Sequence, residues 1–187
     1  MSRIYLIRHG KPSAAWGGAH DDPGLDPGGQ AQAAQAAETL LELPPGERPV
    51  RVASSPMRRC LDTARPLVES LGSKLEILEA VSEIPTPRSL KDRGAWLGQA
   101  MRGLWSEVVG DIDYQVWRAG VVAAVAARPG AAIFTHFVAI NAVVSQLTGE
   151  GAVTVFRPGY ASITVLEEVA GELSIIRLGS EAATGVL

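Results

Sequence analysis

Short apolar runs alternate along the chain with longer stretches of helical periodicity. Residues 4–7 form a run of apolar, β-forming residues, which is typical of a strand buried on both faces. Similar runs follow at 50–53, 75–81 and 131–135. Strands that alternate with helices predict an α/β fold of three layers, in which helices cover both faces of a mostly parallel central sheet.

The stretches between these runs carry helix start and stop signals. Asp26 and Pro27 supply an N-cap and a first-turn proline, and Ser55 with Pro56 offers the same signal before a second helix. The helices predicted in this way span 26–43, 57–71, 114–127 and 138–147.

The remaining segments predict a sheet edge and an insertion. Residues 153–156, 162–167 and 173–178 favour strands at the edge of the sheet. Pro85 and Pro87 interrupt regular structure after the third strand, and 89–110 has the character of a mobile helical insertion. We therefore expect one domain over 1–187, with a lid formed by the insertion at 85–112.

Composition narrows the protein class. The 187 residues suit a single hydrophobic core, and 47% hydrophobic with 20% charged residues excludes disorder. A net charge of -3 argues against a nucleic-acid partner, and the sequence contains no apolar run of ~18 residues that would span a membrane. The lone Cys60 cannot form an internal disulfide, so it is expected to be a packing residue. We expect a cytoplasmic protein.

Polar side chains follow each of the four predicted parallel strands. Arg8 and His9 come after the first strand, Arg58 and Arg59 after the second, Glu83 after the third and His136 after the fourth. Ligands of open α/β sheets bind beyond the carboxyl ends of the strands, so these side chains are candidates for one site.

This set of side chains suits a phosphate ester. Arginine presents a charged fork that matches phosphate oxygens, and a neutral imidazole can attack phosphorus to form a reactive phosphohistidine. Nearby Arg8 and Arg59 should keep His9 unprotonated. Glu83 can protonate the leaving alkoxide if the negative charge of the phosphate raises the pKa of its carboxyl.

The segments that carry these residues resemble the histidine phosphatase superfamily, which includes cofactor-dependent phosphoglycerate mutases and small phosphatases. Ile-Tyr-Leu-Ile-Arg-His-Gly at 4–10 resembles its opening signature, and 25–31 loosely resembles its Leu-Thr-x-x-Gly-x-x-Gln-Ala helix start. Residues 54–64 are similar to Ser-Ser-Pro-Leu-x-Arg-Ala-x-Gln-Thr-Ala, 134–140 to the strand that ends in a second His, and 160–163 to Asn-Ala-Ser-Ile.

The resemblance implies a phosphoglycerate mutase-like fold and a phosphohydrolase of the histidine acid phosphatase type. It implies that His9 is the phosphorylated nucleophile and that Arg8, Arg59 and His136 bind the phosphate. Glu83 is implied as the proton donor, more from its position after the third strand than from a local motif. Neither a metal nor a cofactor is expected.

The sequence departs from the family pattern at four positions. Phe137 replaces a common Gly, so its ring either narrows the pocket or turns away from it. Asn141 stands where Arg is commoner, and Tyr160 replaces Asn. Gly17 replaces an Asn with which the mutases contact phosphate. Substrate preference therefore cannot be transferred from a relative.

Some residues also have plain structural interpretations. Glu83 could be a surface carboxylate like Glu76 and Glu79, and His136 could be a core histidine. The cluster at 20–22 could bind a divalent metal, but hydrated loop residues are the commoner case. The tryptophans near the insertion either form a small core, which we favour, or an apolar wall for an organic substrate; they are Trp96, Trp105 and Trp117.

We favour a metal-independent phosphomonoesterase that acts through phosphorylated His9 on a small phosphorylated substrate or a phosphoprotein. A phosphoglycerate mutase is the first alternative, but a mutase needs a large capping insertion to exclude water, and the segment here is short. The second alternative, a non-catalytic phosphate-binding module, would be favoured by loss of Arg8 or His9, and both are present. A homodimer is left open.

Overall fold

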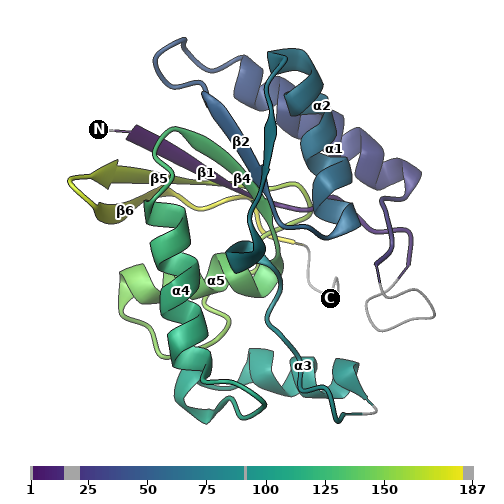
Figure 1. The fold of residues 1–187 in the computed structure, drawn as a ribbon, viewed down its shortest axis with the longest axis vertical. Coiled ribbons are helices and arrows are strands. Elements are labelled where there is room, and N and C mark those ends of the chain that lie inside the picture. Colours follow the sequence, from purple (N-terminus) through teal and green to yellow (C-terminus); the bar gives the residue numbers. More distant parts are fainter. Residues whose placement is uncertain (1, 15–21, 91, 183–187) are drawn as a thin grey trace.

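The computed structural model describes residues 2–14, 22–90 and 92–182. In this part of the chain, six strands form one sheet in the order β3-β2-β4-β1-β5-β6 (Figure 1). The strands are β1 Ser2–Arg8, β2 Arg51–Ser54, β3 Leu75–Ile77, β4 Ala131–Thr135, β5 Ile163–Val169 and β6 Glu172–Arg177.

The first four strands of the chain are parallel, and the last two complete the sheet edge. β1 pairs with β4, β4 with β2 and β2 with β3 in parallel register. β5 is antiparallel to β1, and β6 is antiparallel to β5. The structure thus confirms the predicted α/β fold with a mostly parallel sheet, and it places the ends of β1, β2 and β4 side by side.

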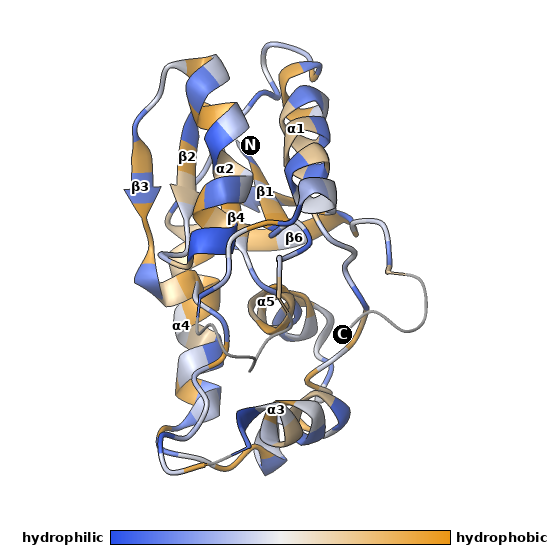
Figure 2. Cartoon of the chain, turned by 90° about the vertical axis from the view of Figure 1, so that its right-hand side faces the viewer, coloured by the Kyte–Doolittle hydropathy of each residue, from blue (hydrophilic) through white to orange (hydrophobic). Residues whose placement is uncertain are grey.

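Helices lie on both faces of this sheet. They are α1 Pro27–Leu41, α2 Arg58–Leu71, α3 Arg93–Arg102, α4 Tyr114–Ala126 and α5 Phe137–Thr148, with short 3-10 helices at Glu79–Val81 and Trp105–Glu107. The Asp26 carboxylate caps α1 by accepting from the Gly29 amide at 2.6 Å, as the sequence predicts. The turns of α1 and α2 alternate between hydrophilic and hydrophobic residues, which suits helices with one face on the sheet (Figure 2).

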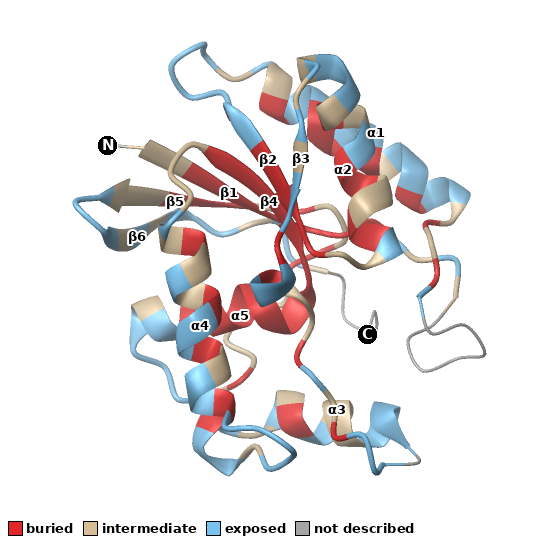
Figure 3. Cartoon of the chain, viewed as in Figure 1, coloured by how far each residue is buried: buried red, intermediate tan, exposed pale blue. Residues whose placement is uncertain are grey.

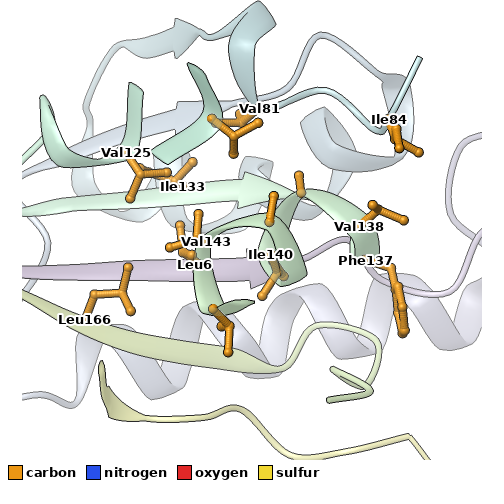
Figure 4. Close-up of a cluster of buried hydrophobic side chains, with 14 of the residues drawn as sticks. Leu6, Val81, Ile84, Val125, Ile133, Phe137, Val138, Ile140, Val143 and Leu166 are labelled. Atoms are coloured by element: carbon orange, nitrogen blue, oxygen red, sulfur yellow. The ribbon is translucent and has the colours of Figure 1, made fainter. Parts of the chain in front are cut away.

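The side chains of β1 alternate between two cores. Ile4 and Leu6 pack in the core shared with α4 and α5, while Tyr5 and Ile7 pack in the core shared with α1 and α2. Figure 4 shows Leu6 within the first of these cores. Figure 3 shows long buried stretches in the central strands β1 and β4 and in α5. Because β1 is buried on both faces, its carboxyl end is held in place, and the candidate site begins at that end.

Two predicted strands differ from the structure. The strand predicted at 75–81 ends at Ile77, because Leu78 and Val81 are buried at the three-residue spacing of a helical turn. Residues 153–156 form no strand, because the Asn141 side chain accepts from the amides of Val155 and Phe156 at 2.9 and 3.2 Å. The Asn141 side chain therefore accepts the backbone hydrogen bonds that a neighbouring strand would accept from this segment.

The segment 85–112 leaves the sheet and returns close to where it started. It contains α3, which lies apart from the sheet below α4 and α5 (Figure 1). The Arg88 amide donates to the Asp111 carboxylate at 2.8 Å, and the Tyr114 hydroxyl donates to the Pro85 carbonyl at 2.8 Å. The two ends of the excursion are thus fastened to each other. The function of this segment as a lid stays a prediction.

The tryptophans near the excursion belong to the core. Trp105 is 1% exposed, and its indole N–H donates to the Ser145 hydroxyl at 2.9 Å. Its ring lies 6.0 Å from that of Trp117, and the Trp96 ring lies 5.6 Å from that of Tyr114. The favoured packing interpretation is confirmed, although they join the main core instead of a separate small one. Among the helices of residues 2–14, 22–90 and 92–182, none has the length and apolarity needed to cross a membrane.

Candidate active site

His9 lies immediately beyond the carboxyl end of β1, where backbone contacts fix its ring. Its amide donates to the Thr135 carbonyl of β4 at 2.9 Å. Its Nδ1 lies 2.8 Å from the Gly10 carbonyl oxygen, and because a carbonyl only accepts, Nδ1 carries the hydrogen. The neutral ring therefore keeps its lone pair on Nε2, which is the form that a nucleophile needs.

The backbone after His9 is held by close packing against α1. A Cβ on Gly10 would lie 2.6 Å from the Gly29 carbonyl oxygen, and a Cβ on Gly29 would lie closer still to the Lys11 carbonyl. Only glycine allows such an approach, which explains glycine at both positions. The Gly10 amide donates to the Thr63 hydroxyl at 2.9 Å, and that hydroxyl donates to the Arg59 carbonyl at 2.6 Å. Thr63 therefore connects the His9 segment to α2.

Burial and positive neighbours both keep His9 neutral. The residue is 6% exposed, and burial lowers its pKa well below the usual value, with further lowering from the Arg59 and Arg8 guanidinium groups. Sequence analysis attributes the lowered pKa of His9 to the two arginines, but burial lowers it more than they do. The imidazole is consequently unprotonated near neutral pH.

Arg59 and His136 form a buried pair behind the nucleophile. Arg59 donates through Nη2 to Nδ1 of His136 at 3.1 Å, so Nε2 of His136 carries the hydrogen and donates to the Ser55 hydroxyl at 2.8 Å. The rings of His9 and His136 have centroids 5.3 Å apart. Arg59 Nη1 also lies 3.7 Å from the Asp22 carboxylate.

Arg8 is held between two aromatic rings. Its guanidinium carbon lies 4.1 Å from the Tyr160 centroid and 5.2 Å from the Phe137 centroid, within the range of cation–π attraction. Nη1 donates to the Pro158 carbonyl at 2.8 Å, and Nε has no partner among the described residues. Two departures from the family pattern, Phe137 and Tyr160, therefore contact the same cation.

Glu83 lies after the 3-10 helix that follows β3, against the N-terminus of α5. Its Oε1 accepts from the amides of Ile84 and Val138, each at 3.1 Å, whereas Oε2 makes one longer contact of 3.5 Å to Val138. Oε2 is thus the oxygen better placed to hold a proton. Burial raises the pKa of this carboxyl, against the lowering effects of the backbone amides, Arg59 and Arg8. Sequence analysis attributes a raised pKa of Glu83 to bound phosphate, but burial raises this pKa without any phosphate.

These groups open onto one cavity of about 250 Å³. Arg8, His9, Arg59 and Glu83 provide its charged or titratable wall, and mostly apolar side chains and glycines provide the remainder. That remainder consists of Pro12, Ala14, Pro23, Gly94, Leu97, Gly98, Met101, Phe137 and Tyr160.

The structure brings four of the five predicted site residues to this cavity. The fifth, His136, is fully buried, lies outside the lining and contacts Arg59. Arg58 points into solvent, where Asp62 lies 3.8 Å from it, so the arginine that reaches the site is Arg59.

The remaining predictions near the site have mixed outcomes. Phe137 is one of the residues that line the cavity. Cys60 is fully buried, as expected for a packing residue. The predictions for Gly17 and for His20 lie outside the described residues. Within the described ranges, no three His, Cys, Asp or Glu side chains are grouped as a metal site.

Sequence reasoning misses three contributors to the site. Thr63 and Ser55 lie inside the motif at 54–64, and their hydroxyl groups could have been noted there as partners for buried polar atoms. The face of α3 that lines the cavity has a weaker signal, a repeat of small and apolar residues at helical spacing within the insertion.

Comparison with known proteins agrees with this arrangement. The family model described as the histidine phosphatase superfamily (branch 1) matches residues 4–181. The comparison with curated proteins found no match.

Solved structures of phosphatases share the fold. A mycobacterial glucosyl-3-phosphoglycerate phosphatase with inorganic phosphate superposes with a TM-score of 0.72 at 22% identity, covering 97% of this chain and 98% of that one. A putative alpha-ribazole-5'-P phosphatase from Escherichia coli gives 0.74 at 17% identity, covering 100% and 99%. A phosphoserine phosphatase from Entamoeba histolytica in complex with 3-phosphoglyceric acid gives 0.68 at 18%, covering 96% and 98%.

Proposed function

Because the chain belongs to the histidine phosphatase superfamily, we propose that it is a metal-independent phosphomonoesterase that works through a phosphohistidine on His9. The observation that carries this proposal is the hydrogen bond from Nδ1 of His9 to the Gly10 carbonyl, which leaves the Nε2 lone pair available. The three structural neighbours described above are all named as phosphatases, which favours hydrolysis over transfer.

The reaction has two steps. In the first, Nε2 of His9 attacks phosphorus, a P–N bond forms, the ester P–O bond breaks, and the leaving oxygen takes the proton of Glu83. In the second, water attacks the phosphohistidine and gives a proton to the Glu83 carboxylate, the P–N bond breaks, and inorganic phosphate leaves. The side chains return to their starting protonation states.

The arginines stabilise charge during both steps. The phosphoryl oxygens carry most of the charge of the transition state, and preformed cations at those oxygens lower its energy. Arg8 and Arg59 are fixed before substrate arrives, Arg8 by two rings and a carbonyl and Arg59 by His136. We assign to His136 the role of orienting Arg59 and contributing to the phosphate site from behind it.

Trapping of the intermediate tests the proposal. The protein is mixed with a ³²P-labelled aryl phosphate, quenched in alkali and digested, and the labelled peptide is identified. We expect an alkali-stable, acid-labile phosphoryl group on His9 and no label or turnover in His9→Ala. His20→Ala, which removes the third histidine of the sequence, is the matched control and should retain both. Label on another residue, or turnover by His9→Ala, would contradict the mechanism.

A further inference from the structure

The cavity has an apolar side opposite its phosphate-binding groups, and from this we propose a substrate class. We infer that the substrate is a monoester of phosphate with an uncharged, largely apolar alcohol, whose carbon skeleton lies against α3. This inference rests on the proposed function and names the ester that the same site would take.

One face of α3 supplies the apolar wall. Gly94, Leu97, Gly98 and Met101 occupy positions i, i+3, i+4 and i+7 of the helix, so they share one face of it, and all four line the cavity. Phe137, from the start of α5, lines the same cavity. A hydrocarbon bound between these side chains loses contact with water, which favours binding in proportion to the apolar area buried.

The glycines on this face leave room for a ligand. Among the described residues outside the backbone of α3, a Cβ on Gly94 would have only the Asp92 carboxylate within 4 Å, and a Cβ on Gly98 only the end of the Arg102 side chain. Neither glycine is therefore required by close packing of the protein against itself. The space that side chains would fill at these positions is open to the substrate.

The opposite face of α3 is fastened to the protein. The Trp96 indole donates to the Val109 carbonyl at 2.9 Å and packs against Tyr114, and Ala100 is buried. The Asp92 side chain caps the helix by accepting from the Ala95 amide at 2.9 Å. These contacts set the rotation of the helix and direct its glycine and leucine face to the cavity.

The charges on the cavity wall disfavour a second anionic group on the substrate. Among the described lining residues only Arg8 and Arg59 are cations, and the phosphoryl group would occupy both. Glu83 adds a carboxyl beside them. A substrate carboxylate directed at α3 would lose its hydration without gaining a partner there, which is costly. Arg102 lies beside Gly98 but outside the lining, so its removal is part of the test.

The first experiment uses the unaltered protein and the esters ethyl, butyl and hexyl phosphate. Their leaving groups have nearly equal basicity, so differences in kcat/KM report binding of the chain. We expect kcat/KM to rise up to about fourfold for each methylene buried, and 3-phosphoglycerate to be hydrolysed more slowly than ethyl phosphate. A flat series, or preference for 3-phosphoglycerate that Arg102→Ala abolishes, would overturn the substrate class while leaving the phosphatase function intact.

The second experiment places a cation on the apolar wall. Leu97→Lys should lower the ratio of kcat/KM for hexyl phosphate to that for 3-phosphoglycerate by at least about tenfold, as expected when an apolar contact is exchanged for a charged one. Gln99→Lys, on the exposed face of the same helix, is the matched control and should leave the ratio unchanged. An unchanged ratio in Leu97→Lys contradicts the inference. If no ester is hydrolysed in either experiment, the proposed function fails and the substrate class with it.

Discussion

The Arg59 guanidinium donates to Nδ1 of His136 over 3.1 Å, and both side chains are buried. Nε2 of His136 donates a hydrogen bond to the Ser55 hydroxyl, so each nitrogen of this ring has a hydrogen-bond partner. The second histidine of the family motif consequently orients an arginine in this structure. Its contribution to catalysis should depend on an acceptor at the Nδ1 position.

Substitution of His136 tests this dependence. His136→Ala removes the acceptor and should reduce kcat on an aryl phosphate by about 10²- to 10³-fold, the usual cost of one lost stabilising donor. His136→Asn offers an amide oxygen near the position of Nδ1 and should retain more activity than the alanine variant. Steady-state kinetics with thermal unfolding as a folding check decides the question, and equal losses in both variants would show that the acceptor is irrelevant.

The raised pKa of Glu83 predicts an alkaline limit to activity. A carboxyl with a raised pKa stays protonated to higher pH than usual, so it can donate its proton below that pKa and loses this ability above it. On an alkyl phosphate, kcat should fall as pH rises through the pKa of Glu83. Glu83→Gln should abolish this pH dependence and should lose more rate on poor leaving groups than on good ones.

Glu79→Gln provides the control for this profile, because Glu79 is an exposed carboxylate on the preceding 3-10 helix. It should leave the profile as it is in the unaltered protein. An alkaline limb that persists in Glu83→Gln would assign the proton to a different group.

Thr63 predicts a combined loss of stability and rate. Thr63→Val keeps the shape of the side chain but leaves the Gly10 amide without its 2.9 Å acceptor, which should cost about 1–3 kcal/mol of unfolding free energy. Because that amide adjoins His9, kcat should fall as well. Thr39→Val removes an exposed hydroxyl that bonds within α1, and urea unfolding should show little change there.

Close packing of α1 against the Gly10 segment predicts a glycine requirement. Gly29→Ala would place a Cβ against the Lys11 carbonyl and should cost about 1–3 kcal/mol of unfolding free energy through overpacking. Gly46→Ala serves as the comparison, because a Cβ there would have no atom of the described residues within 4 Å apart from its chain neighbours. Similar denaturation midpoints for the two variants would mean that α1 can move away without cost.

Chelation tests the role assigned to the arginines. Arg8 and Arg59 supply permanent positive charge to the phosphoryl oxygens, so turnover of an aryl phosphate should persist in excess EDTA. Assays before and after dialysis against the chelator measure this directly. A loss of turnover that added divalent metal restores would exclude the metal-independent mechanism.

Much of the site could be predicted because it follows from strand direction. Arg8, Arg59 and Glu83 come from distant parts of the chain, yet each lies at or beyond the end of one of the parallel strands, and parallel strands end at the same edge of the sheet. The apolar runs identify those strands because burial on both faces leaves little choice of residue. The residue types at the edge then indicate the chemistry.

The features of the site and the fold that the sequence does not predict depend on tertiary contacts, which leave no periodic pattern in the sequence. The hydroxyl of Thr63 is one group among many, and its role depends on how closely α2 approaches Gly10. The apolar run at 153–156 has the pattern of a strand in sequence alone. It forms none, because the Asn141 side chain accepts the hydrogen bonds that a strand partner would accept. Whether Leu97 faces the cavity depends on how Trp96 is anchored, which is a tertiary contact.

The hydrogen bond between the Arg88 amide and Asp111 has a consequence for how this protein can diversify. Trp105 fastens the later part of the intervening stretch to the core, but the part before Gly103, which carries α3, can change in length without moving β4 or Glu83, and doubling a loop adds only about 0.6 kcal/mol of closure entropy. Under the proposed function, the reactive side chains and the wall that would select the substrate thus lie in separate segments of the polypeptide. Replacing residues 89–102 with a foreign segment should yield a hydrolase with a different substrate preference and the same phosphoryl chemistry.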